Sequence, residues 1–266
     1  LNRSLLLKKI IKKKIKMITL QLKKNKKAYF AGDFHLGKPD IESSNSREKK
    51  IILWLNHIKK DAQEVFLMGD LFDFWFEYKH VIPKNNLRFL SIISNMIDEG
   101  INFYYFIGNH DLWVLNYFNE LGIKTYKKHQ KFKLNNKIII VGHGDGLGKG
   151  DLGYKILKHI FKNKFCQFLF RWIHPDIGIP LGQFLSGSKS RMSLTNKSKL
   201  NDERIFQYCV EYNKKSPVDI FIFGHSHYAN KKNVSSKSTY FNCGDWITNS
   251  YYLKTNGEKY ELKTFS

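Results

Sequence analysis

Short apolar runs that end in glycine recur along the chain. They occupy residues 28–32, 65–69, 103–108, 138–142 and 220–224 and are rich in β-branched and aromatic side chains. Continuous apolar runs of this length are typical of strands that are buried on both faces. The pattern therefore predicts five buried core strands.

Amphipathic helices are predicted between the first three runs, because apolar residues recur there three or four positions apart. The residues concerned are Ile51, Ile52, Leu55 and Ile58 in the first helix and Phe89, Leu90, Ile93, Met96 and Ile97 in the second. Alternation of strand and helix at this interval predicts an α/β fold, with ligand-binding groups just past the carboxyl ends of the strands.

A long connection, from Gly144 to Asp219, breaks this order. It contains an aromatic run at 161–172 and a basic, serine-rich segment at 186–193. A connection of this length carries its own structure or a function. We therefore predict a helical insertion that caps the site and ends in a scaffold helix around residues 201–213.

The composition indicates a folded protein and narrows its class. Hydrophobic residues make up 42% of the chain and aromatic ones 15%, enough for a core, so disorder is excluded for most of it. Nowhere do 18 apolar residues run together, which excludes a membrane-spanning helix. The cysteines at 166, 209 and 243 form no paired motif, which is typical of a reducing compartment.

The net charge of +22, from 45 Lys+Arg against 23 Asp+Glu, raises the question of a nucleic-acid partner. Only six of the basic residues are arginine, and asparagine is abundant at 22, which is the bias of an AT-rich genome. Nucleic-acid sites favour the bidentate fork of arginine. Compositional drift explains the charge best, attraction to anionic lipid or a phosphorylated substrate comes next, and no nucleic-acid partner is predicted.

Residues 1–27 form a basic leader with eleven basic residues and no acidic one. Apolar residues at helical spacing would let it lie on an anionic membrane as an amphipathic helix. The favoured interpretation is a disordered basic tail, or an over-called start upstream of Met17. Residues 28–266 are predicted to form a single domain with the cap insertion at about 150–200.

Potential metal ligands follow each of the five apolar runs. The segments are Gly32-Asp33-Phe34-His35, Gly69-Asp70-Leu71-Phe72-Asp73, Gly108-Asn109-His110-Asp111, Gly142-His143-Gly144-Asp145 and Gly224-His225-Ser226-His227. Imidazole nitrogen with carboxylate and amide oxygen, and no thiolate, suits divalent ions such as Mn²⁺, Fe²⁺ or Zn²⁺. The ligands are too many for one ion, and two ions about 3.5–4 Å apart need a bridging group, for which a carboxylate is suited.

The spacing of the potential ligands within two of these segments indicates which side chains share a metal centre. On an extended segment, residues i and i+2 point to one side, so Asp33 with His35, and His225 with His227, are expected to serve one metal centre. One such pair alone is weak evidence, because a buried histidine satisfied by the backbone is commoner. Five segments in this order, each after a strand, predict a metal site.

This ordered set resembles the signature of the calcineurin-like metallophosphoesterases, over roughly residues 28–228. The resemblance implies a four-layer αββα sandwich of two mixed sheets with a helical cap insertion. It implies two divalent ions bridged by Asp70, for which we expect Mn²⁺, with Fe²⁺ or Zn²⁺ as alternatives. The implied ligands are Asp33, His35, Asp70 and His227 for one ion and Asp70, Asn109, His143 and His225 for the other.

Further roles follow from the resemblance. His110 would stand beside the transferred phosphoryl group as electrostatic stabiliser or general acid, with Asn109 and Asp70 as the other catalytic residues. The aspartates implied to orient histidines or the backbone are Asp73, Asp111 and Asp145. Two dications activate water and neutralise the charge that builds on phosphoryl oxygens, so the site favours phosphoester or pyrophosphate hydrolysis.

A narrower resemblance concerns the substrate. Segments 69–78, 143–154 and 242–246 are similar to those of the bacterial UDP-2,3-diacylglucosamine hydrolases of lipid A synthesis, which split the pyrophosphate to lipid X (2,3-diacylglucosamine 1-phosphate) and UMP. The likeness is greatest to the Bacteroidetes type, whereas the best-known branch has arginine at the position of His110. Because His110 differs from that arginine, a broader phosphodiesterase or phosphatase is the alternative enzyme. A non-catalytic membrane- or nucleic-acid-binding module is the alternative of another class.

The resemblance also implies substrate contacts. Tyr154 would hydrogen-bond the substrate, or be a buried structural tyrosine, and Asp151 of the same segment is a further candidate. Lys189 and Arg191 are candidate phosphate ligands, or solvated surface charges. The cap is expected to take acyl chains and touch anionic headgroups, or simply to bury its aromatic residues on the core. We expect a cytoplasmic enzyme, peripheral on the inner face of the inner membrane, that binds a lipid-linked nucleotide sugar.

Overall fold

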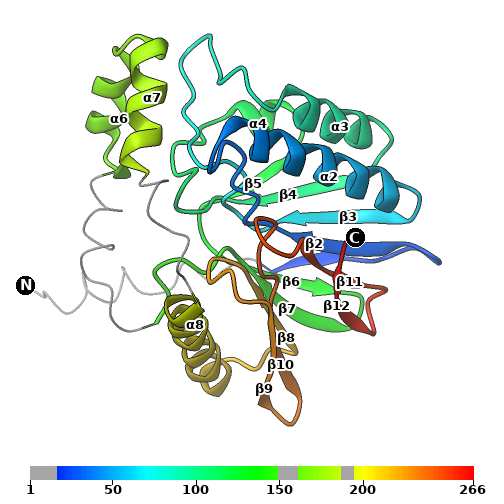
Figure 1. Cartoon of the computed structure of the whole chain (residues 1–266). Coiled ribbons are helices and arrows are strands. Elements are labelled where there is room, and N and C mark those ends of the chain that lie inside the picture. The colour runs from blue at the N-terminus through cyan, green and yellow to red at the C-terminus, as the bar shows by residue number, and fades with distance from the viewer. Residues whose placement is uncertain (1–16, 149–160, 187–194) are drawn as a thin grey trace, which may run out of the picture.

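Two mixed β-sheets packed face to face form the centre of the protein (Figure 1). The computed structural model describes residues 17–148, 161–186 and 195–266. In these residues the first sheet has the order β12 (Tyr260–Thr264), β11 (Tyr251–Thr255), β2 (Lys27–Ala31), β3 (Ala62–Leu67), β4 (Asn102–Phe106), β5 (Lys124–Tyr126). The second has the order β1 (Ile18–Leu20), β6 (Gln130–Leu134), β7 (Lys137–Val141), β8 (Ile220–Phe223), β10 (Ser238–Asn242), β9 (Asn230–Ser235).

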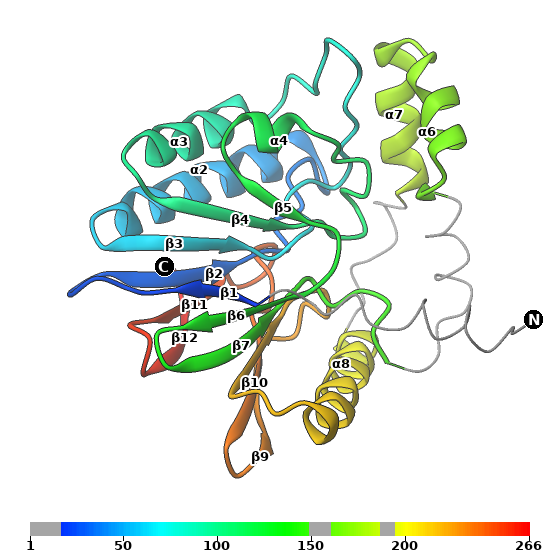
Figure 2. The ribbon, with the colours of Figure 1, turned by 180° about the vertical axis from the view of Figure 1, so that it is seen from behind.

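Helices cover the outer face of each sheet (Figures 1 and 2). On the first sheet lie α2 (Ile41–Lys59), α3 (Leu87–Asp98) and the short α4 (Tyr117–Glu120), and on the second lies α8 (Thr195–Lys215). Between the sheets, the Phe66 ring stacks on Phe30 at 4.5 Å and on Tyr104 at 4.7 Å between ring centroids. The layers therefore run helix, sheet, sheet, helix, which confirms the predicted αββα sandwich.

The five predicted core strands are present as β2, β3, β4, β7 and β8, each ending one or two residues before its glycine. Strands β2, β3, β4 and β5 run parallel, as do β7, β8 and β10. Helix α2 buries Ile51, Leu55 and Ile58 as predicted, whereas Ile52 lies on its outer side. Helix α8 is longer than the expected scaffold helix, because it begins at Thr195.

Strand β1 lies in the segment that the composition assigns to the leader. It pairs in parallel with β6, where Ile18 is opposite Phe132 and Leu20 opposite Leu134. Leu22 is buried between the sheets, and its backbone N–H donates to Asn135 Oδ1 at 2.8 Å. The second sheet therefore includes residues 18–20 of the basic leader, and residues 1–16 lie outside the described part.

Ahead of α8, the connection between β7 and β8 holds α6 (Lys164–Arg171) and α7 (Pro175–Leu185), which we call the cap helices (Figure 1). Phe170 of α6 packs on Phe76 and Trp113 of the body. Helix α7 packs closely against Tyr78 and Phe74 through Gly178 and Gly182. A Cβ at Gly178 would collide with Tyr78, and one at Gly182 would collide with Phe74.

The aromatic run of the cap divides between core and solvent. Phe170 is 8% exposed, whereas Phe165 is 66% and Trp172 is 77% exposed. Burial on the core therefore accounts for only part of the run. Among the described residues, no helix has the length and apolar character needed to span a membrane.

Candidate metal centre

The side chains predicted as metal ligands converge at the carboxyl ends of five strands from both sheets. They are Asp33 and His35 after β2, Asp70 after β3, Asn109 after β4, His143 after β7, and His225 and His227 after β8. Nitrogen and oxygen atoms of these residues form overlapping groups with all atoms of a group within 4.8 Å of one another. The assignment of each side chain to one ion stays a prediction.

The first group consists of Asp33, His35 and His227. Asp33 Oδ1 lies 3.4 Å from His227 Nε2 and 3.9 Å from His35 Nε2, and the two Nε2 atoms are 3.2 Å apart. Asp33 Oδ2 accepts a hydrogen bond from the His225 backbone N–H at 2.9 Å, so the β2 loop is tied to the β8 loop.

The second group consists of Asp70, His143 and His225, and Asn109 lies beside it. His143 Nδ1–H donates to the Met68 carbonyl at 2.7 Å, which leaves Nε2 as the ligand atom. That Nε2 lies 3.2 Å from Asn109 Oδ1 and 3.4 Å from Asp70 Oδ2.

Asp70 belongs to the second group, and with His35 and His110 it forms a further group that overlaps the first. Its Oδ2 atom lies 3.4 Å from His143 Nε2 and 3.7 Å from His35 Nε2. Its Oδ1 atom accepts a hydrogen bond from the His110 backbone N–H at 2.8 Å, which fixes the carboxylate plane. The position is the one that a bridging carboxylate needs.

The glycines that precede the ligands make room for ligands of neighbouring loops. A Cβ at Gly224 would overlap the Asp33 carboxylate, and one at Gly108 would overlap Asp70. A Cβ at Gly69, which has a φ of +89°, would collide with the His143 ring. The strand–glycine rhythm of the sequence therefore reflects close approach between loops.

The extended geometry predicted for the two His-containing pairs is wrong. Asp33, His35, His225 and His227 have φ values of 52°, 44°, 66° and 59°, and Asp70 has 49°, all in the left-handed region. In each pair the first and third residues are left-handed. This backbone conformation points both side chains toward the metal centre. His225 and His227 consequently enter different groups. Such conformations cost energy and are maintained only where the surroundings enforce them.

Asp73 joins the metal centre to the cap. Its Oδ1 atom lies 3.4 Å from His110 Nδ1, 3.7 Å from His35 Nδ1 and 3.9 Å from Lys38 Nζ. Its Oδ2 atom accepts a hydrogen bond from Ser186 Oγ, at the end of α7, at 2.8 Å. His110 Nδ1–H donates to the Asp73 carbonyl at 3.0 Å, so this aspartate orients His110 through two of its groups.

Asp111 and Asp145, also predicted to support the site, act differently. Asp111 accepts hydrogen bonds from Gly108 N–H at 2.6 Å, from Leu71 N–H at 3.0 Å and from the Tyr105 hydroxyl, and so holds two ligand loops together. Asp145 is half-buried, and its negative charge works to raise the pKa of the neighbouring histidines His143 and His225.

Asp245 is a site residue that the sequence interpretation missed. It is buried after β10, and its Oδ2 atom lies 3.6 Å from His227 Nδ1. The next residue, Trp246, donates its backbone N–H to the Asp33 carbonyl at 3.2 Å. A signal was present, because the segment Asn242-Cys243-Gly244-Asp245 repeats the order of strand, glycine and aspartate.

Burial and neighbouring charges shift the pKa values of the site groups in different directions. Burial lowers the pKa of His35 and His225 to about 3 and that of His227 to about 4, so all three are neutral at pH 7. Burial opposes ionisation of Asp70, but His143 and His110 hold the pKa of this carboxylate well below its usual range. Burial also opposes protonation of His143, yet Asp70 above all raises its pKa to about 10.

The donor set fits a pair of divalent cations. Asp33 Oδ1 is buried and has no hydrogen-bond donor among the described residues, although it faces two imidazole nitrogens. Imidazole nitrogens, carboxylates and an amide oxygen, with no thiolate, are ligands for Mn²⁺, Fe²⁺ or Zn²⁺. The His/Asp groups are thus consistent with a dinuclear metal site.

Metal binding is expected to stabilise the fold. At a free concentration 1,000 times its Kd, an ion that binds only the native state raises the free energy of unfolding by about 4 kcal/mol. For a chain of this size, each such ion raises Tm by roughly 8–16 °C. Adding Mn²⁺ to chelator-treated protein should raise Tm in scanning calorimetry by that order. His143→Ala should give a clearly smaller rise, and an equal rise in both proteins would contradict a role for His143 in metal binding.

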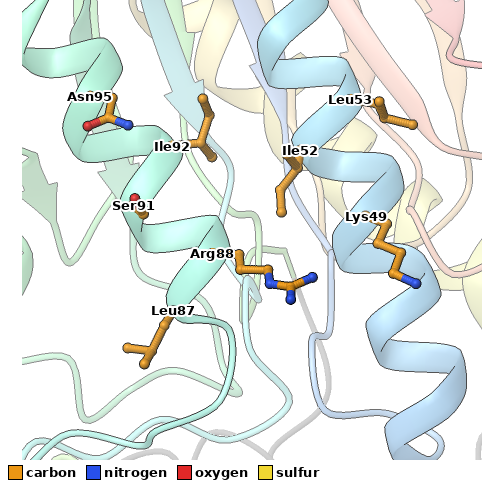
Figure 3. A pocket seen from close by; sticks show the side chains of 8 residues that line it. All are labelled: Lys49, Ile52, Leu53, Leu87, Arg88, Ser91, Ile92 and Asn95. Carbon is orange, nitrogen blue, oxygen red and sulfur yellow. The ribbon is translucent and has the colours of Figure 1, made fainter.

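Of two hollows formed by the described residues, the smaller one adjoins the metal centre. A hollow of ≈ 780 Å³ opens between α2 and α3, lined by Ile52, Leu53, Arg88 and their neighbours, and contains none of the predicted ligands (Figure 3). A cavity of ≈ 120 Å³ lies beside Asn109 and His110. The other residues that line this cavity are Phe74, Trp75, Leu112, Trp113, Phe161, Gly182, Leu185 and Ser186.

The predicted substrate contacts Tyr154, Asp151, Lys189 and Arg191 lie outside the described residues. Among the described residues, the cavity between the cap helices and His110 is the feature that adjoins the predicted site of chemistry. Sequence patterns did not indicate its lining, because aromatic residues such as Phe74 and Trp113 are also ordinary core residues.

Comparison with known proteins identifies the family of this chain. The family model of calcineurin-like phosphoesterases matches residues 26–229. UDP-2,3-diacylglucosamine hydrolase of Porphyromonas gingivalis is 29% identical over 254 residues, which cover 90% of this chain and 97% of the relative. The hydrolase of the same name from Actinobacillus succinogenes is 26% identical over 226 residues, 83% of this chain and 92% of the relative. A solved archaeal phosphodiesterase aligns with a TM-score of 0.47 and 12% identity, over 90% of this chain and 99% of its own. Because the family model matches most of the chain, the chain belongs to the calcineurin-like phosphoesterases.

Proposed function

We propose that the chain hydrolyses the pyrophosphate of UDP-2,3-diacylglucosamine to 2,3-diacylglucosamine 1-phosphate and UMP. Its curated relatives of that name align over nearly their whole length, 97% and 92%. The observation that carries the proposal is the apolar cavity beside Asn109 and His110, under the cap helices. A phosphoester site with an adjoining apolar cavity suits a substrate whose phosphate is linked to an apolar group.

The chain's own residues divide the work at the site. The ligand set would hold two divalent ions, which would supply Lewis acidity to activate water and neutralise phosphoryl charge. Hydrolysis adds water to one phosphorus and breaks its bond to the bridging oxygen, so that each product carries a phosphate. Because a phosphate leaves readily without being protonated, we assign His110 chiefly to stabilising charge on the phosphoryl oxygens.

The native metal is proposed to be Mn²⁺. The ligand set mixes imidazole nitrogen with carboxylate and amide oxygen, and this mixture suits Mn²⁺ as well as Fe²⁺ and Zn²⁺. Metal analysis of protein purified without added metal decides between them.

We also propose that the cap lies against an anionic membrane surface on the cytoplasmic side. Its exposed face carries Phe165, Phe168, Trp172 and Phe184, all more than half exposed. Arg171 and Lys164 stand on the same helix as the first two. Apolar side chains interleaved with basic ones bind anionic interfaces, where aromatic rings enter the headgroup region. The three free cysteines accord with a reducing compartment.

A substrate comparison with a cavity variant tests the proposal. Leu185→Trp narrows the cavity, and overpacking of this kind costs about 1–3 kcal/mol, so KM for UDP-2,3-diacylglucosamine should rise about tenfold or more. Hydrolysis of bis(p-nitrophenyl) phosphate should not change, because that substrate has no acyl chain. Ile177→Trp, on the exposed part of the same helix, is the matched control.

The alternative enzyme is a broader phosphodiesterase, which the histidine at position 110 favours. Wild-type activity on bis(p-nitrophenyl) phosphate with none on UDP-2,3-diacylglucosamine would reject the lipid substrate and leave this alternative. A non-catalytic binding module is disfavoured by the family membership and by the assembled ligand set.

A further inference from the structure

A buried arginine lies directly behind the metal centre. Arg47 belongs to α2 and is only 8% exposed. Its Nη2 group donates to the His35 carbonyl at 2.9 Å and also to the Lys38 carbonyl. Its Nε atom is buried and has no hydrogen-bond partner among the described residues. The guanidinium is therefore committed to the backbone of one ligand loop, residues 33–38.

This loop has an unusual backbone. His35 has a φ of 44° and Gly37 a φ of +106°, both left-handed. The Lys38 N–H donates to the His35 carbonyl at 3.2 Å, and the Gly37 N–H donates to Ser44 Oγ of α2 at 2.7 Å. Arg47 adds its donors to the two carbonyls of this turn. Because the turn directs the His35 side chain, its geometry decides where the imidazole lies.

The environment of Arg47 is not that of an ordinary structural ion pair. Among the described residues, no carboxylate lies within 4.0 Å of its guanidinium. Burial lowers the pKa of Arg47, and the more distant carboxylates of Asp245 and Asp73 counter that shift. Those two aspartates also face the histidines of the site, since Asp245 lies by His227 and Asp73 by His35. The guanidinium thus stands among groups that orient metal ligands.

We propose that Arg47 is a positioning residue that fixes the His35 imidazole for metal binding, by holding the His35 and Lys38 carbonyls on one guanidinium. The proposal rests on the metal-dependent function proposed for this site, whatever its organic substrate. An arginine is suited to this task because its planar fork offers several donors in fixed directions, whereas lysine offers a single ammonium on a shorter side chain.

The test is Mn²⁺ binding to chelator-treated protein, followed by calorimetry and by electron paramagnetic resonance. Wild-type protein should bind two ions and give the spectrum of an exchange-coupled pair. In Arg47→Met one ion should bind about 10–100-fold more weakly, as when other groups that orient ligands are removed. The second ion should keep its affinity, so the coupled spectrum gives way to that of an isolated ion. Arg88→Met, an exposed change on α3, is the matched control and should match the wild type.

Arg47→Lys keeps the charge and makes the test independent of how well Arg47→Met folds. It should bind one ion at least about threefold more weakly than wild type, because one ammonium replaces the fork. Folded Arg47→Lys or Arg47→Met protein that binds both ions with unchanged affinity would overturn the proposal, even if Tm were lower. A wild-type protein that binds no Mn²⁺ would instead overturn the proposed metal-dependent function. Loss of activity on UDP-2,3-diacylglucosamine alone bears on neither ion.

Discussion

Replacing Asp70 by asparagine is expected to lower turnover by about 10³-fold or more, the effect of losing roughly 4 kcal/mol of transition-state stabilisation. Asp70 Oδ2 lies 3.4 Å from His143 Nε2 and 3.7 Å from His35 Nε2, between the two ligand groups. Asparagine has the same shape, and its oxygen can still accept the hydrogen bond from the His110 N–H. Its NH₂ group would then face the position that the bridging oxygen occupies, where it can bind no cation.

The measurement pairs steady-state kinetics with metal analysis of the purified variant. Asp70→Asn should contain fewer than two ions per chain and keep the fold of the wild type by circular dichroism. Asp98→Asn, an exposed change at the end of α3, should retain full turnover and both ions. Near-normal turnover in metal-loaded Asp70→Asn would contradict the bridging role.

His110→Ala is the second change with a large expected effect. A positioned acid or charge-stabilising group contributes about 10²–10⁴-fold, and kcat should fall by that order while both ions stay bound. The reason is geometric, because His110 Nδ1 is engaged by the Asp73 carbonyl at 3.0 Å and the residue also lines the cavity next to the metal centre. We therefore assign any contact with a substrate oxygen to the opposite ring nitrogen, Nε2.

His110→Arg separates the two roles considered for this residue. Arginine supplies positive charge but does not give up a proton near neutral pH. Charge stabilisation predicts that His110→Arg recovers much of the turnover lost in His110→Ala, with bis(p-nitrophenyl) phosphate or the lipid substrate. Equal loss in both variants, with both ions present, would assign His110 to proton transfer instead.

The ligand loops could be predicted from the sequence because they depend on strong local signals. Buried parallel strands show as continuous apolar runs, and the first turn after each strand holds the ligands Asp33, Asp70, Asn109, His143 and His225. The extended backbone predicted for the Asp33/His35 and His225/His227 pairs was wrong, because sequence spacing does not show a left-handed conformation. That conformation follows from contacts between loops, such as the His225 N–H on Asp33 Oδ2.

Other features could not be predicted, because their residues do not differ in the sequence from ordinary surface or loop residues. In a chain with 45 Lys+Arg, the buried Arg47 and Lys38 look like any surface cation. Strand β9 alternates half-buried and exposed positions and carries two lysines, so its sequence does not stand out from a loop. The bond between Ser186 and Asp73 joins residues 113 apart, which no local pattern reveals.

Strand β1 covers the outer edge of β6 in the second sheet. It is the outermost strand beside β6, and it occupies the backbone N–H and C=O groups on that side. Without residues 18–22, β6 would become an open edge next to a gap left by Leu22, and such edges recruit strands from other chains. We therefore expect the short strand β1 to shield the edge of β6. The lysines close to it in the sequence should discourage pairing with a further strand.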